Sequence, residues 1–259
     1  MKKRLYFFVA AVLVLLISST LLVRFAPLGR TAEKTFMHQT GPVQVSAAEK
    51  LSLKQETDIR VTEITAVTDE TARCTRVEAL LLEYGRTGNA LLLPELMNNG
   101  LYLLAQPQAS AVNTDHAAKN GVDISVLSPC VFYDGYTKEW IVLCGGWWNS
   151  DRWESCFAGD LGERNCFGVT CVGKHEAYSS HVSYAAAGLW SDDETIYKLT
   201  PNRSGGDGAG SFEFELQDYI TITGLFDRHY IGERWAGFCR FAPGYENYDT
   251  ELTAYYTCD

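Results

Sequence analysis

The sequence CVFYDGYTKEWIVLC, residues 130–144, carries the clearest structural signal of this chain. Two runs rich in β-branched and aromatic residues, 131–133 and 140–143, flank a segment of polar and turn-forming residues. This pattern predicts an antiparallel hairpin centred near Tyr136 and Thr137. In such a hairpin Cys130 would lie opposite Cys144, and the two side chains could form a disulfide bond.

Further strand-like runs follow this hairpin, separated by clusters of Gly, Asp and Asn. The run 212–216 alternates Phe, Glu, Phe, Glu and Leu, as expected for a strand with one buried face and one solvated face. Residues 123–259 are therefore predicted to form a mainly β domain, an antiparallel sandwich or a barrel-like fold. The predicted strands are Val131–Tyr133, Trp140–Leu143, His181–Ala186, Phe212–Leu216, Tyr219–Thr223, Trp235–Phe241 and Leu252–Thr257.

Residues 56–122 have a less regular pattern and are predicted to form a smaller helical or mixed segment. The run from Asp58 to Val67 is rich in β-branched residues, which predicts a strand. In 76–105 the abundance of Leu, Glu, Ala and Met favours two short helices. Two leucine runs on either side of 85–89 also fit a hairpin, so both interpretations stay open.

The N-terminal 24 residues predict export. The run Leu5–Val23 holds 19 residues without a charge, and three basic residues at 2–4 precede it. A helix of about 20 residues crosses the ~30 Å hydrocarbon core of a membrane. No good cleavage site follows the run, so an uncleaved anchor with a cytoplasmic N-terminus is favoured over a cleaved signal peptide or a buried core helix. Residues 25–55 are then predicted to form a stalk, with a short helix near 47–55.

All eight cysteines lie beyond this leader, and export would place them in a compartment where disulfide bonds form. Their even number is consistent with a complete set of bridges, whose pairing the sequence does not determine. A disulfide-stapled domain is therefore predicted. The candidate disulfide residues are Cys74, Cys130, Cys144, Cys156, Cys166, Cys171, Cys239 and Cys258.

Negative charge dominates the exported part. Without the basic residues at 2–4, 19 Lys and Arg remain against 32 Asp and Glu, a formal charge of −13. Such a surface repels phosphate backbones, so no nucleic-acid partner is expected, although the charge also serves solubility. With 46% hydrophobic residues, the chain can build a sizeable core in one large domain or two small ones.

The most unusual local feature is residues 145–153, GGWWNSDRW, with three tryptophans in seven residues. Indole rings stack on sugars or anchor protein and membrane contacts, and neighbouring polar side chains can bond ligand groups. The alternative is that most of these rings fill the core. The candidate ligand-binding residues are Trp147, Trp148, Trp153, Asn149 and Arg152.

Catalytic and metal-binding patterns are weak. Residues 208–212 lack the second glycine of a nucleophile elbow, and a pair of Cys166 or Cys171 with His175 or His181 competes with disulfide formation. The five histidines form no His-x-x-x-His pair, and the chain has no Cys-x-x-Cys. The acidic run 192–194 and the glycine-rich segment 205–208, which holds Asp207, do not match a calcium loop. No catalytic residue, metal ligand or cofactor is predicted.

These features favour a membrane-tethered or secreted binding module, with its C-terminal domain outside the cytoplasm and residues 5–23 as its contact with the membrane. A glycan or a protein is the expected kind of ligand. An exported hydrolase of cell-wall or extracellular polymers is the first alternative, and a secreted toxin or bacteriocin-like effector is the second.

Overall fold

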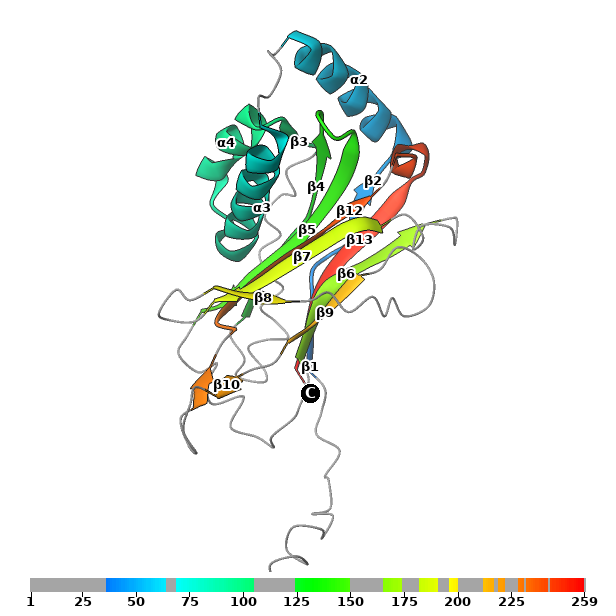
Figure 1. The fold of residues 1–259 in the computed structure, drawn as a ribbon. Coiled ribbons are helices and arrows are strands. Elements are labelled where there is room, and N and C mark those ends of the chain that lie inside the picture. Colours follow the sequence, from blue (N-terminus) through cyan, green and yellow to red (C-terminus); the bar gives the residue numbers. More distant parts are fainter. Residues whose placement is uncertain are drawn as a thin grey trace, which may run out of the picture. The chain divides into compact units, whose positions relative to one another are not determined.

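The computed structural model describes residues 36–63, 69–104, 124–149, 165–173, 182–190, 196–199, 212–216, 219–221, 228–230, 232–241 and 243–258. The described chain is mainly β, and its two larger sheets are antiparallel and packed like a sandwich (Figure 1). The prediction of a mainly β fold with antiparallel, sandwich-like sheets is therefore confirmed for the described residues. Every predicted strand from 131 onward has a counterpart among the observed strands.

The predicted hairpin lies within the six-stranded sheet. Strands β4 (Ile124–Asp134) and β5 (Glu139–Trp148) pair antiparallel around a turn at 135–138, with Tyr133 opposite Trp140. This confirms the hairpin and its centre. The strand order of the sheet is β3 (Leu101–Leu103), β4, β5, β12 (Arg234–Phe241), β7 (Val182–Trp190) and β8 (Ile196–Leu199).

The second sheet joins the two ends of the folded part. Strand β13 (Thr250–Cys258) pairs with β1 (Phe36–Gln39), β2 (Val43–Val45) and β6 (Asn165–Gly173). Strand β9 (Phe212–Leu216) extends the sheet beyond β6, and Phe212 and Phe214 are buried, as their alternation predicts. A separate two-stranded sheet holds β10 (Tyr219–Thr221) and β11 (Arg228–Tyr230).

Helices occupy most of the described part of 47–98. Helix α2 (Ala47–Glu63) takes the place of the strand predicted from Asp58 as far as Glu63, because a helix that begins at residue 47 continues into the β-branched run; the rest of that run, 64–67, lies outside the described residues. Helix α3 (Glu70–Thr87) begins where Asp69 accepts a hydrogen bond from the Ala72 amide and ends at Gly88, with φ 63°. A 3-10 turn η1 (Ala90–Leu92) leads into α4 (Leu93–Asn98), so helices and not a hairpin form here.

Two layers of core lie on the two faces of the six-stranded sheet. One lies between the sheets and includes Trp140, Trp235 and Phe214; the other lies under α3 and α4 and includes Leu81 and Phe132. Figure 1 shows α3 and α4 on one face of the sheet and β6 and β13 on the other. The six-stranded sheet is therefore buried on both sides, which explains why β4 and β5 are apolar at nearly every position.

The predicted Cys130–Cys144 disulfide is wrong. The register places Cys130 opposite Leu143, one residue away from the predicted partner. Because side chains alternate along a strand, this shift puts the two thiols on opposite faces of the sheet. Cys144 belongs to the core between the sheets and Cys130 to the core under the helices.

The predicted stalk and domain boundary also differ from the structure. Strands β1 and β2 pair with β13, so the described residues from 36 onward belong to the folded unit Thr35–Asp259 and not to a stalk. The predicted helix near 47–55 is present as the first half of α2. Among the described residues, 69–104 do not form a segment separate from the β domain, because α3 packs on the six-stranded sheet and β3 belongs to it.

The predicted anchor lies outside the described residues. Among the residues that the structure describes, no helix is long and apolar enough to span a membrane.

Candidate functional site

The adjacent tryptophans of β5 point to opposite faces of the sheet. Trp148 is buried between the sheets, where its ring meets that of Tyr256 edge-on at 6.1 Å between centroids. Trp147 is half-buried on the face of the sheet that carries the helices. Its ring lies beside Gly88 at the end of α3, where a Cβ added to that glycine would be 3.4 Å from the ring. Both rings therefore pack against the protein itself.

The polar candidates near these rings form no described cluster. Asn149 is exposed, and its side-chain oxygen accepts a hydrogen bond from the Ser125 hydroxyl at 3.1 Å. Arg152 and Trp153 lie outside the described residues. The structure thus brings none of the five predicted ligand residues together around a pocket that it describes.

No disulfide joins the five cysteines whose side chains are described. Burial raises the pKa of the Cys130 thiol to about 12 and that of Cys144 well above its ordinary value. Thiols held in their protonated form are poor nucleophiles, so neither suits catalysis. Cys156 lies outside the described residues, as do the side chains of Cys171 and Cys258. Among the described residues, no three His, Cys, Asp or Glu side chains group as metal ligands.

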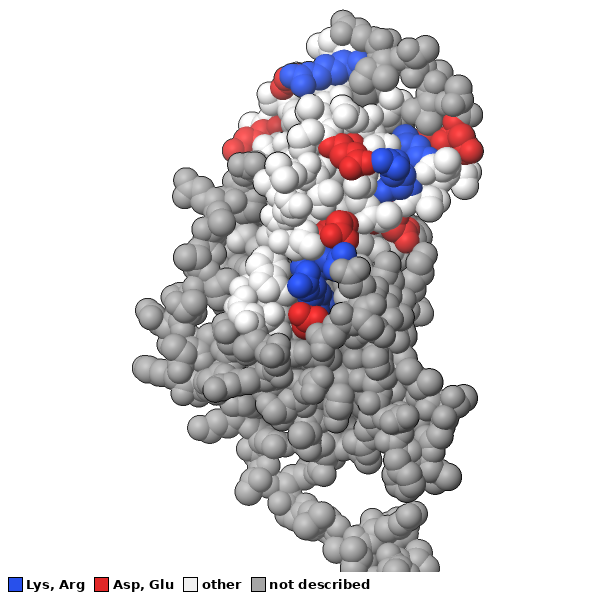
Figure 2. Space-filling model, turned by 90° about the vertical axis from the view of Figure 1, so that its left-hand side faces the viewer, with Lys and Arg blue, Asp and Glu red and all other residues white. Residues whose placement is uncertain are grey.

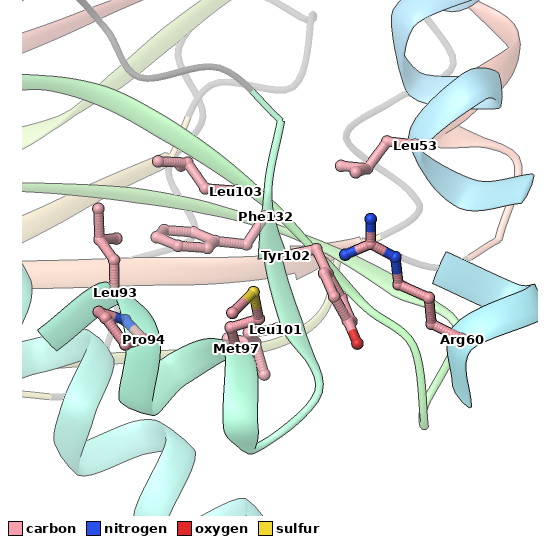
Figure 3. A pocket seen from close by; sticks show the side chains of 9 residues that line it. All are labelled: Leu53, Arg60, Leu93, Pro94, Met97, Leu101, Tyr102, Leu103 and Phe132. Carbon is pink, nitrogen blue, oxygen red and sulfur yellow. The ribbon is translucent and has the colours of Figure 1, made fainter. Parts of the chain in front are cut away.

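A pocket of about 400 Å³ lies where α2, α4 and the edge strand β3 meet; we call it the β3 pocket (Figure 3). Its walls are apolar apart from one guanidinium group and one phenol. Met97, on α4, is 45% exposed at this pocket, so an apolar side chain is open to solvent there. The lining residues are Leu53, Arg60, Leu93, Pro94, Met97, Leu101, Tyr102, Leu103 and Phe132.

Helix α2 forms one wall and is fastened at its N-terminal half. Lys50 is fully buried; its ammonium group donates hydrogen bonds to the carbonyl oxygens of Tyr245 and Tyr248 and lies 3.9 Å from the centre of the Tyr245 ring. Lys54 pairs with the nearly buried carboxylate of Glu246. These contacts hold α2 to the segment between β12 and β13.

The C-terminal half of α2 carries the charge of the pocket. Asp58 pairs with Lys138 in the β4–β5 turn at 2.7 Å, which ties this end of the helix to the sheet. Two residues further along α2, Arg60 pairs with Glu56 and lies 5.9 Å from the centre of the Tyr102 ring. Figure 3 shows Arg60 reaching from α2 toward Tyr102 on β3. The cation is therefore held at the α2 side of the pocket.

A buried ion-pair network supports the α4 side of the β3 pocket. The carboxylate of Asp134, fully buried at the end of β4, lies 3.1 Å from guanidinium nitrogens of both Arg73 on α3 and Arg240 on β12. Arg73 also donates to the carbonyl oxygen of Asn99, directly after α4. The Arg73 guanidinium lies 4.7 Å from the centre of the Tyr136 ring. These contacts fix the path of the chain from α4 into β3.

The outer face of α3 and α4 carries mixed charge. Figure 2 shows blue and red side chains beside one another in small groups, with white surface between them. Two ion pairs of these helices join Arg76 with Glu95 and Arg86 with Glu83. Over the described residues of this face, no charge of one sign gathers.

Comparison of the chain with protein-family models, with curated proteins and with solved structures finds no match. The site is therefore argued from its own geometry.

The β3 pocket was not predicted from the sequence, because its walls come from three separate segments that showed no shared motif. One signal was present: Leu93, Pro94 and Met97 put apolar side chains on a very short helix, more than one buried stripe requires. Chemically, the pocket can exclude water from an apolar group and offer one cation to an anion at its rim.

Proposed function

We propose that this chain is a binding module outside the cytoplasm and that its ligand occupies the β3 pocket. The leader supports the location: residues 5–23 would hold the chain at the membrane, or its cleavage would release it. The observation that carries the proposal is the β3 pocket itself, an apolar space of about 400 Å³ with a single guanidinium group at one side. This composition is typical of ligand sites, in which few polar groups orient an apolar ligand.

The proposal moves the site away from the tryptophan segment at 145–153. Trp147 and Trp148 pack against their own protein, whereas Met97 stays 45% exposed beside other apolar side chains. Exposed apolar surface next to a pocket costs solvation free energy that a bound ligand can recover.

An aryl carboxylate tests the site. The full-length chain in lipid nanodiscs is titrated with 4-(trifluoromethyl)phenylacetate, and the line width of the fluorine NMR signal is measured, with empty nanodiscs as the blank. We expect broadening by the wild type, less by Arg60→Gln and more by Glu56→Gln, because Glu56 neutralises the Arg60 cation.

Two matched variants locate the binding. Met97→Glu places a carboxylate in the pocket and is expected to abolish the broadening. Leu91→Glu makes the same change in charge on η1, at a side chain that is 84% exposed and does not line the pocket, and should leave the broadening intact. Broadening that survives Met97→Glu, or that Leu91→Glu also removes, contradicts the β3 pocket as the ligand site.

A further inference from the structure

The β3 pocket is polar at one end only. Figure 3 shows Leu93, Pro94 and Met97 of α4 together at one end, and Arg60 and Tyr102 at the other. Among the described lining residues, the guanidinium and the phenol are the only polar side chains. A ligand that fits both ends therefore has an apolar body and one polar head.

The floor of the pocket consists of side chains, and the main chain of β3 is covered. Leu101 is 1% exposed, Tyr102 is 8% exposed, and Phe132 is fully buried. The accessible walls come from the helices, where Met97 and Arg60 are exposed. Over β3 a ligand therefore meets side-chain hydrocarbon rather than main-chain amides and carbonyls.

This lining disfavours ligands with polar groups along their length. A sugar hydroxyl or a peptide amide placed here would lose its hydrogen bonds to water without replacement, which weakens binding by about tenfold or more for each group. A methylene group gains from the same transfer, because each one buried strengthens binding by about fourfold. The walls therefore select a hydrocarbon chain.

The two aromatic rings of the lining are already engaged with the protein. The buried Phe132 ring meets that of Tyr84 edge-on at 6.2 Å between centroids, and the Tyr102 ring lies 5.9 Å from the Arg60 guanidinium. An aliphatic chain needs no stacking partner and can follow the leucine, proline and methionine side chains of the other walls. A water takes up about 30 Å³ in the liquid, so a space of about 400 Å³ holds roughly a dozen groups of that size, such as methylenes.

Arg60 selects a single negative charge. Its side chain and that of its partner Glu56 are both more than half exposed, so their ion pair contributes little and the guanidinium can bind a second carboxylate. Asp58, two residues before Arg60, is paired with Lys138. A phosphate would bring a second charge that no other described cation lining the pocket balances, whereas a carboxylate fits the planar guanidinium through two hydrogen bonds.

We infer that the ligand of the β3 pocket is an unbranched aliphatic monocarboxylate, a fatty acid of medium chain length, with its carboxylate at Arg60 and its chain along α4. This inference rests on the proposed function and names its ligand class. A free fatty acid and the acyl chain of a membrane lipid share the hydrocarbon, but only the free acid carries the carboxylate.

The test measures binding of radiolabelled hexanoate, octanoate and decanoate to the full-length chain in nanodiscs by equilibrium dialysis. Each measurement is repeated with Met97→Glu, and the difference between the two proteins cancels uptake by the bilayer. Leu91→Glu, the matched control outside the pocket, should bind as the wild type does. We expect the Met97-dependent affinity to rise about 15-fold with every two methylenes, since each buried methylene contributes about fourfold.

A second arm tests the head group. Arg60→Gln should weaken decanoate binding about fivefold, the upper limit for an exposed ion pair, and leave binding of 1-decanol unchanged. Glu56→Gln should strengthen decanoate binding, because it removes a competing carboxylate. Equal binding of decanoate and 1-decanol, with no effect of Arg60→Gln, assigns the pocket to a neutral acyl chain such as that of a membrane lipid and overturns the inference.

The possible outcomes separate this inference from the proposed function. If the aryl carboxylate binds in a Met97-dependent way but the affinity of the alkanoates does not rise with chain length, the ligand class is wrong and the site stands. If neither kind of carboxylate binds, while thermal unfolding shows that the wild type and both variants are folded, both proposals are wrong. A dimer in analytical ultracentrifugation of the chain in detergent, dissociated by Met97→Glu, assigns the pocket to a second copy and overturns the inference.

Discussion

The side chain of Asp134 joins three segments near the site. Its carboxylate has no exposure to solvent and accepts hydrogen bonds from Arg73, Arg240 and the Tyr136 amide. The three donors come from α3, β12 and the β4–β5 turn. A buried ion pair adds little stability compared with apolar residues, but removal of the buried carboxylate leaves Arg73 and Arg240 only their pairs with the more exposed Glu70 and Glu139.

We therefore predict that Asp134→Asn destabilises the protein by about 3–5 kcal/mol, because two buried guanidinium groups lose their carboxylate. The measurement is urea-induced unfolding. The matched control is Glu83→Gln, which breaks the half-exposed pair with Arg86 within α3. A surface pair contributes at most about 1 kcal/mol. Similar losses in the two variants would show that Asp134 acts as a surface carboxylate.

The thiol of Cys130 predicts a dependence of stability on alkaline pH. Burial raises its pKa to about 12, while an unfolded thiol titrates near its ordinary value of about 8.5. The folded state thus keeps the proton that the unfolded state loses, and its stabilising contribution, complete below pH 8.5, is lost as pH rises toward 12.

Between pH 8 and 10 this loss amounts to about 1.9 kcal/mol for one thiol. The expected result is that Cys130→Val reduces the decline in unfolding free energy over this interval by about that amount. Parallel profiles of the wild type and Cys130→Val would contradict a buried, protonated Cys130.

At the level of elements, the close approach of α3 to the sheet rests on glycine. A Cβ on Gly145 of β5 would lie 2.1 Å from the carbonyl oxygen of Gly85 in α3, and that contact is between backbone atoms. No side-chain rotation relieves it. Gly145→Ala is therefore expected to destabilise the protein by about 3 kcal/mol or more in thermal unfolding, since helix and strand must move apart. Gly41→Ala, with no atom within 4 Å of the new Cβ, should change stability little.

Helix α2 depends on a buried lysine. Lys50→Met keeps the volume of the side chain but leaves the carbonyl oxygens of Tyr245 and Tyr248 without their donor. We predict a loss of roughly 2–4 kcal/mol, faster hydrogen exchange along α2 and weaker binding in the β3 pocket, because one of its walls loosens. Asp58 also lies on α2, and Lys138 in the β4–β5 turn is its exposed ion-pair partner. Lys138→Met should therefore lower the stability and the protection of α2 by less than Lys50→Met does. Unchanged exchange in α2 with Lys50→Met contradicts this fastening role.

Sequence patterns predicted the elements with a strong local signal. The hairpin at 130–144 and the strand 212–216 follow from β-branched and alternating residues, and both are present. The register within the hairpin is set by the turn at 135–138, which pairs Asp134 with Glu139 and thereby places Cys130 opposite Leu143, one residue from the predicted partner, so the predicted disulfide was lost. Strand β6 escaped prediction because its glycines and cysteines resemble a loop.

On the scale of the whole molecule, the β3 pocket combines segments that are far apart in the sequence. Leu53 and Arg60 come from a region predicted to be stalk and strand, and Phe132 comes from the centre of the β domain. Contacts of this kind depend on how α2 crosses the end of the sheets, which is fixed by pairs such as Lys54 with Glu246. Periodicity and composition do not encode such distant pairs, so the fold class could be predicted while the site could not.

The leader determines where this site would meet its ligand. An uncleaved helix at 5–23 predicts that the full chain stays in the membrane fraction after carbonate extraction and that externally added protease reaches the folded unit. Leu13→Arg places a charge at the centre of the run, at a cost of about 2.5–3.5 kcal/mol for insertion, and should reduce both signals. Leu28→Arg, outside the run, makes the same substitution and should leave both unchanged. Export with a mature N-terminus between residues 20 and 35 would contradict the anchor and leave the β3 pocket on a diffusible protein.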